Sequence, residues 1–132
     1  MRTIVNGLLV REGSVLLAKR SPHWKSYAGL WSFPGGNVEQ KETLTEVLVR
    51  ELREEIGITP TTYTHLSSIK DPNTPPSDPI VYHMYRVTSW EGGEPVIIGD
   101  EHSELTWKKY DAAAAIPDPP LQEYRNLFTK LG

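Results

Sequence analysis

One stretch of the chain decides its fold: Gly36-Asn37-Val38-Glu39-Gln40-Lys41-Glu42-Thr43-Leu44-Thr45-Glu46-Val47-Leu48-Val49-Arg50-Glu51-Leu52-Arg53-Glu54-Glu55-Ile56-Gly57-Ile58. Its central part predicts a helix over 43–56, because apolar residues recur there at helical spacing. Thr43 followed three residues later by Glu46 is a capping box, and Gly57 suits the left-handed position that ends a helix. The stretch therefore predicts a loop followed by a sharply bounded helix.

The predicted helix has one apolar stripe, and glutamates lie close to it. The stripe is formed by Leu44, Val47, Leu48, Leu52 and Ile56. On a helical wheel Glu51 and Glu55 fall inside this arc, and Glu54 falls at its edge. Carboxylates three and four residues apart repel one another unless a cation neutralises them. A metal site and a solvated acidic face are both open at this point, although solvated charges belong opposite the apolar stripe.

The residue types around the helix restrict the metal. Ligands that are all oxygen atoms select Mg²⁺ or Mn²⁺ rather than Zn²⁺, and the absence of cysteine excludes a thiolate site. Arg50 can orient a neighbouring carboxylate by a bidentate hydrogen bond or form a surface salt bridge. His23, His65, His83 and His102 match no metal-ligand spacing, so we expect structural roles for all four.

The spacing of these residues resembles the Nudix box, the signature of the Nudix hydrolase family. Gly36 is followed after five residues by Glu42, and seven more separate Glu42 from the run that begins at Arg50 and ends at Ile58. All defined positions of the box match. The similarity to the MutT-like branch extends through 33–36 and 90–95. It implies an α/β Nudix fold, a mixed β-sheet sandwiched between α-helices.

The resemblance also assigns roles. It implies that Mg²⁺, or Mn²⁺ in its place, binds the diphosphate of the substrate. The implied metal ligands are a backbone carbonyl that maps near Gly35 and the carboxylates of Glu51, Glu54, Glu55 and Glu101. In catalysis it implies roles for Arg50, Glu51, Glu54 and Glu101, with either Glu51 or Glu101 as the base that takes the water's proton. Glu104 is close enough in sequence to compete with Glu101. Arg20 resembles a phosphate-contacting arginine, against the alternative of a solvated strand end.

The rest of the chain predicts further strands and a second helix. Runs 3–10 and 14–19 should be central strands of a hairpin that turns at Glu12-Gly13. A short extended piece over 30–33 should stop at Pro34-Gly35-Gly36. Additional strands are expected near 63–69, 80–90 and 104–107, and a final helix over 121–131. At 132 residues we expect a single domain, 1–132.

Composition excludes several classes of protein. Four Trp, six Tyr and 38% hydrophobic residues are typical of a globular chain rather than a disordered one. The net charge of −3 disfavours a nucleic acid polymer as partner, whereas a small nucleotide stays possible because a cation can supply positive charge. No run is long enough to span a membrane. We expect a cytoplasmic protein that is a monomer or a homodimer.

The leading hypothesis is a MutT-like hydrolase that cleaves a nucleoside triphosphate, possible substrates including 8-oxo-dGTP, to a monophosphate and pyrophosphate. The alternatives are hydrolysis of ADP-ribose or another nucleoside diphosphate derivative, and a non-catalytic nucleotide-binding module. RNA 5′-end processing is disfavoured by the acidic balance. Asp118 lies where the MutT-like branch presents an amide to the base. It can accept hydrogen bonds from a purine edge or cap the helix that follows.

Overall fold

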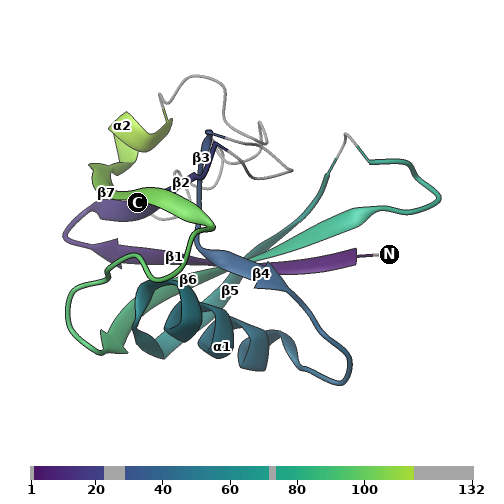
Figure 1. The fold of residues 1–132 in the computed structure, drawn as a ribbon, viewed down its shortest axis with the longest axis horizontal. Helices are drawn as coiled ribbons and strands as arrows, with labels where there is room; N and C mark the ends of the chain where they lie inside the picture. Colours follow the sequence, from purple (N-terminus) through teal and green to yellow (C-terminus); the bar gives the residue numbers. More distant parts are fainter. Residues whose placement is uncertain (1, 23–28, 72–73, 115–132) are drawn as a thin grey trace.

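The computed structural model of the protein describes residues 2–22, 29–71 and 74–114. The first two strands form the centre of the sheet (Figure 1). Strand β1, Arg2–Arg11, and strand β2, Ser14–Arg20, are joined at Glu12-Gly13, where both residues have positive φ angles of 50° and 76°. Two positive φ angles are the signature of the tight hairpin turn that the sequence predicts. The predicted hairpin is therefore confirmed.

Strand β1 joins partners of opposite direction. It pairs in parallel with β6, Ile80–Glu91, and antiparallel with β4, Gly35–Asn37. The sequence predicts that the extended piece stops at Pro34-Gly35-Gly36. The extended piece does stop before Pro34, since β3 spans Trp31–Ser32, but the sequence does not predict the separate strand β4 that begins at Gly35. Backbone pairing with β1 supplies the hydrogen bonds that local propensity cannot reveal.

Two outer strands are longer than the sequence predicts. β5, Thr59–Lys70, pairs with β6 along its whole length, and β7, His102–Lys109, pairs with β2. Pro60 lies inside β5, where the register is irregular. A proline is tolerated there because β5 is the edge of the sheet and needs no donor on its outer side. Tertiary pairing thus extends both strands beyond their apolar cores.

The helix α1, Leu44–Ile56, begins at the predicted capping box. Thr43 accepts a hydrogen bond from the backbone of Glu46, and the Glu46 side chain accepts one from the backbone of Thr43. The helix ends at Gly57, whose φ of 70° is left-handed as predicted. The residues of its apolar stripe pack on the β1 side chains that point to this face, Val5 and Leu9.

The opposite face of the sheet has its own core. Leu8 and Val10 of β1 point there, since alternate side chains of a strand face opposite sides. A short helix that the sequence does not predict, α2, Tyr110–Ala114, packs Ala113 against this core (Figure 1). Helices thus cover both faces of a mixed sheet, which confirms the predicted α/β architecture. The helix expected over 121–131, together with Asp118, lies outside the described residues.

Within the part of the chain that the structure describes, no helix is long and apolar enough to cross a membrane.

Candidate active site

The glycine pair of β4 gives the helix carboxylates room to approach the main chain. A Cβ at Gly36 would lie 2.3 Å from Cδ of Glu51, and a Cβ at Gly35 would lie 2.0 Å from the carbonyl oxygen of Val5. Neither position tolerates a side chain without movement. The carboxyl group of Glu51 therefore packs directly against the main chain of Gly36.

Arg50 organises the loop before the helix. Its Nε donates to Oε2 of Glu42 at 2.8 Å, and its Nη2 donates to Oε1 at 2.9 Å. The same guanidinium donates to Glu51 at 2.9 Å and to the carbonyl of Asn37 at 3.2 Å. The hydrogen bond with Arg50 lowers the pKa of Glu42, and that with Glu42 raises the pKa of Arg50. Of the two roles that the sequence leaves open for Arg50, the structure shows the bidentate pairing, with Glu42 as the partner.

The carboxyl group of Glu51 has a raised pKa. Its side chain is 14% exposed, and burial raises its pKa to about 7, with the charge of Glu55 acting in the same direction. Arg50 opposes this shift without cancelling it. Burial and a second carboxylate disfavour the ionised form of Glu51, and a bound cation would stabilise that form. The inward position predicted for Glu51 and Glu55 is confirmed, since Glu55 is 8% exposed.

The side chain of Glu55 is fixed by a hydrogen bond from strand β4. The amide of Gly35 donates a hydrogen bond of 2.8 Å to Oε2 of Glu55. This contact joins β4 to the last turn of α1 and keeps the carboxylate buried. The amide of Gly35 therefore lies at this carboxylate, and the ligand role that the resemblance implies for a backbone carbonyl near Gly35 stays a prediction.

The loop between β6 and β7 is tied to the end of α1. The amides of Val96 and Ile98 donate to the carbonyls of Ile56 and Glu55, at 3.1 and 2.8 Å. The last carbonyls of a helix have no partner within the helix, so these bonds satisfy groups that would otherwise be unpaired. Further along, the carbonyl of Glu101 accepts from the amide of Ser21 at 2.9 Å. These hydrogen bonds hold the loop so that Glu101 lies near Glu55, in the last turn of the helix.

Three side chains meet where this loop reaches the helix. Glu55, Glu101 and His102 each offer one ligand atom, and these atoms lie within 4.8 Å of one another. Glu104, the sequence alternative to Glu101, is exposed on β7 opposite Lys19. Among the described residues, the group of possible metal ligands includes Glu101 and not Glu104.

Arg20 lies beside this group. It ends β2 and is paired in register with His102 across a β-bulge. Bulges are frequent near active sites, where they redirect a side chain. The structure brings Arg20 to the edge of the candidate site.

The site residues fit a divalent cation. Burial and the neighbouring Glu55 raise the pKa of Glu51, and the carboxylates of Glu55 and Glu101 converge together with the imidazole of His102. Both ring nitrogens of that imidazole are buried and have no hydrogen-bond partner among residues 2–22, 29–71 and 74–114. Buried polar groups without a protein partner commonly bind water or an ion.

Comparison with known proteins agrees with this geometry. A model of the NUDIX domain matches residues 1–130. The chain belongs to the Nudix family. This Nudix hydrolase is 36% identical over 121 residues to a CTP pyrophosphohydrolase of Escherichia coli K12, covering 91% of this chain and 84% of the relative. It is 37% identical over 99 residues to an 8-oxo-dGTP diphosphatase of Proteus vulgaris, covering 75% and 76%.

Solved structures place the Nudix hydrolase in the MutT-like branch. A MutT Nudix hydrolase from Burkholderia pseudomallei superposes with a TM-score of 0.83 at 28% identity, covering 99% of this chain and 98% of the other. The predicted family, branch and enzyme class are therefore confirmed.

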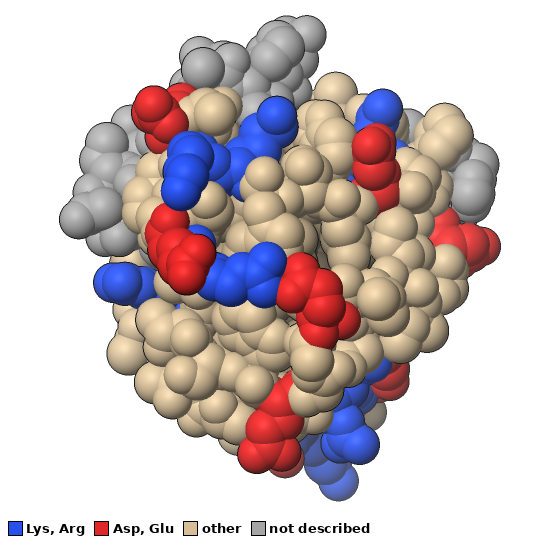
Figure 2. Space-filling view, turned by 90° about the vertical axis from the view of Figure 1, so that its left-hand side faces the viewer, with Lys and Arg blue, Asp and Glu red and all other residues tan. Residues whose placement is uncertain are grey.

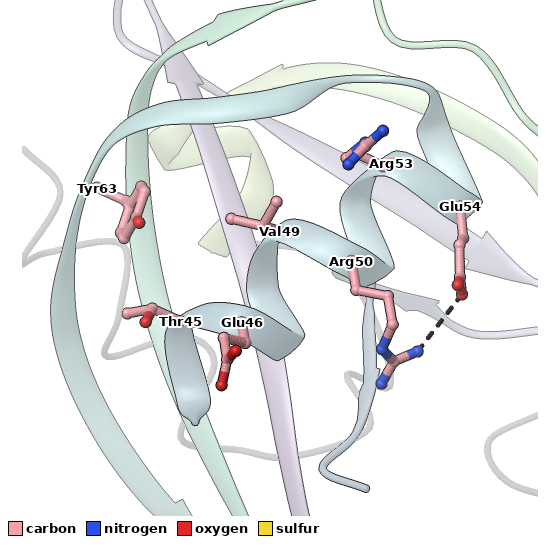
Figure 3. A pocket seen from close by; sticks show the side chains of 7 residues that line it. All are labelled: Thr45, Glu46, Val49, Arg50, Arg53, Glu54 and Tyr63. Carbon is pink, nitrogen blue, oxygen red and sulfur yellow. Dashed lines mark hydrogen bonds and ion pairs between the residues drawn. The ribbon is translucent and has the colours of Figure 1, made fainter. Parts of the chain in front are cut away.

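A hollow on the outer side of α1 does not coincide with the carboxylate cluster of the Nudix hydrolase (Figure 3). Its lining consists of Thr45, Glu46, Val49, Arg50, Arg53, Glu54 and Tyr63. Glu54 lies among these lining residues and points toward Arg50, with which it pairs at 3.4 Å, and its side chain is 60% exposed (Figure 3). Of the predicted carboxylate ligands, Glu54 is thus the outermost, as its edge position on the helix predicts.

Sequence reasoning about this Nudix hydrolase missed His102. Its spacing from the other histidines matches no metal motif, so a structural role is expected from sequence. The structure places it between Glu55 and Glu101 instead. The sequence signal that could have found it is its adjacency to Glu101.

Proposed function

We propose that this protein hydrolyses nucleoside triphosphates to a monophosphate and pyrophosphate with the help of Mg²⁺ or Mn²⁺. The observation that carries the proposal is the meeting of Glu55 and Glu101 at the end of the helix that also buries Glu51. Carboxylate oxygens are the ligands that these hard cations prefer. Two relatives above 35% identity are named for a nucleoside triphosphate substrate, CTP or 8-oxo-dGTP.

In this proposal the chain's own residues hold the cation and the water. Glu51, Glu54, Glu55 and Glu101 would bind the cation, with the backbone of Gly35. When bound, such an ion neutralises charge on the diphosphate and lowers the pKa of a water molecule. Arg20 would contact a phosphate group from the edge of the site.

Arg50 serves this arrangement indirectly, because it ties the loop residue Glu42 to Glu51 through the guanidinium. The base is one of two carboxylates, Glu51 or Glu101, and each can be removed separately. The pKa of about 7 of Glu51 belongs to the metal-free protein, and a bound cation would favour its ionised form, which is the form that takes a proton.

The surface is compatible with a small substrate. On the face shown in Figure 2, acidic and basic side chains lie next to one another and form no continuous basic patch. Long nucleic acids are usually bound by such patches. A nucleotide needs only the local positive charge of a cation and of Arg20.

A substrate panel with product identification tests the proposal. We expect hydrolysis of CTP, dCTP, dGTP and 8-oxo-dGTP to monophosphate and pyrophosphate, complete loss of activity in a chelator and recovery with Mg²⁺ or Mn²⁺. Glu55→Gln should lower kcat by several orders of magnitude, because it removes a charge from the cation site. ADP-ribose as the best substrate, or recovery with Zn²⁺ alone, would contradict the proposal.

The base-reading residue is tested in the same panel. Asp118→Ala should change the ranking of the nucleotides if Asp118 accepts hydrogen bonds from the base. An unchanged ranking would leave Asp118 as a helix cap only.

A further inference from the structure

His102 is a buried histidine with unusual surroundings. It begins β7, directly after Glu101, and its side chain is 3% exposed. Neither ring nitrogen has a hydrogen-bond partner in the part of the chain that the structure describes. A buried donor or acceptor without a partner is unfavourable, and most buried polar atoms in proteins have one. The ring of His102 therefore adds no hydrogen bond that stabilises the fold in the described part of the chain.

The ring of His102 faces two carboxylates. Its Nε2 lies 3.5 Å from Oε2 of Glu101 and 3.8 Å from Oε2 of Glu55. Both separations exceed a normal hydrogen bond by several tenths of an ångström. The imidazole is thus close to both groups and bonded to neither.

Hydrogen bonds fix the side chain of Glu55 and the main chain of Glu101. Oε2 of Glu55 already accepts from the amide of Gly35, and the carbonyl of Glu101 accepts from the amide of Ser21. The side chain of Glu101 has no such bond to a backbone amide among the described residues. A donor that holds this carboxylate must therefore come from a neighbouring side chain, and Nε2 of His102 lies 3.5 Å from its Oε2.

We propose that His102 is a positioning residue. By donating Nε2–H to the carboxylate of Glu101 it holds that group beside Glu55, so that the pair presents oxygen atoms to one divalent cation. The inference rests on the proposed function, because it assumes that these carboxylates bind the cation. Groups that orient metal ligands in this way typically change metal affinity or activity by about 10–100-fold when they are removed.

The test is Mn²⁺ binding to the full chain without nucleotide, followed by the electron paramagnetic resonance signal of the free ion. His102→Leu should weaken Mn²⁺ binding by about 10–100-fold. His102→Gln, whose amide nitrogen reaches the position of Nε2, should recover most of the affinity. His102→Asn, whose amide reaches only the position of Nδ1, should resemble the leucine variant. The matched control is His65→Leu, an exposed histidine on β5 that should bind Mn²⁺ as the wild type does.

Metal-free stability separates positioning from a structural role. Nε2 of His102 lies 3.5 Å from Oε2 of Glu101, longer than a normal hydrogen bond, and the proposed bond tightens only with the cation. His102→Leu should therefore melt in chelator at a temperature close to that of the wild type. A large fall in melting temperature together with equal Mn²⁺ affinity would overturn the inference.

The remaining outcomes distinguish the two proposals. Equal affinity of wild type and His102→Leu, or affinity of the glutamine variant as low as that of the asparagine variant, overturns the positioning role alone. Should the leucine variant fail to fold, the comparison of glutamine with asparagine still decides. Wild-type protein that binds no Mn²⁺ would reject the metal-dependent function on which the inference rests.

Discussion

Arg50 holds Glu42 by two parallel hydrogen bonds, from Nε at 2.8 Å and from Nη2 at 2.9 Å. The pair joins the helix α1 to the loop that precedes it. A guanidinium can span a carboxylate in this way, whereas an ammonium group cannot. The loop geometry at Gly36 therefore depends on an arginine.

Arg50→Lys should lower kcat by about tenfold or more, since it loses the bidentate contact and the bond to Glu51. The melting temperature should fall as well. Steady-state kinetics and thermal unfolding measure the two effects. Arg53→Lys, an exposed arginine on the same helix, serves as the control and should behave as the wild type. Equal kinetics of both variants would show that the bidentate pair is dispensable.

Gly36→Ala should displace Glu51. The new Cβ would stand 2.3 Å from Cδ of that residue, so the carboxyl group must move away from the backbone. We expect Mn²⁺ affinity to fall by about tenfold or more. Asn37→Ala changes the neighbouring, exposed side chain and should have little effect. Wild-type affinity in the Gly36 variant would mean that Glu51 does not bind the cation in its observed position.

Glu51 makes metal-free stability depend on pH. Its folded pKa of about 7 lies above the ordinary value of 4.5, so the folded protein binds a proton that the unfolded chain releases between these values. The free energy of unfolding should therefore decrease as pH rises from about 5 to about 7. In chelator, Glu51→Gln should stabilise the protein relative to wild type at pH 8 by on the order of 2 kcal/mol.

Thermal unfolding of wild type and Glu51→Gln at pH 5 and pH 8 measures this difference. Glu104→Gln, an exposed glutamate, provides the control for loss of a charge. The same stability difference at both pH values would contradict the raised pKa of Glu51. Saturating Mg²⁺ should shrink the pH dependence, because a bound cation favours the ionised carboxylate.

Glu101→Gln should lower kcat by about 100-fold, with a smaller change in KM, because a water-positioning group acts mainly in the transition state. Glu104→Gln should retain wild-type kinetics, since its exposed side chain lies outside the carboxylate cluster. The kinetic parameters with a nucleoside triphosphate decide between them. A defect in the Glu104 variant alone would reverse the choice of Glu101.

Local sequence determined the helix and the direction of its glutamates. The capping box at Thr43 and the left-handed Gly57 involve residues within one turn of the helix end, so their signals are present in the sequence itself. The burial of Glu51 and Glu55 follows from helical periodicity alone. The tight turn at Glu12-Gly13 is equally local.

Tertiary structure decided which residues lie next to these glutamates. The parallel pairing of β1 with β6 joins segments far apart in the chain, and no local pattern specifies that partner. The hydrogen bonds from Val96 and Ile98 to the end of α1 bring Glu101 and His102 to Glu55. The sequence shows Glu101 only as a glutamate in a loop and His102 as a histidine without a motif. Long-range contacts place both at the carboxylates, because the distances between them depend on the path of the whole sheet.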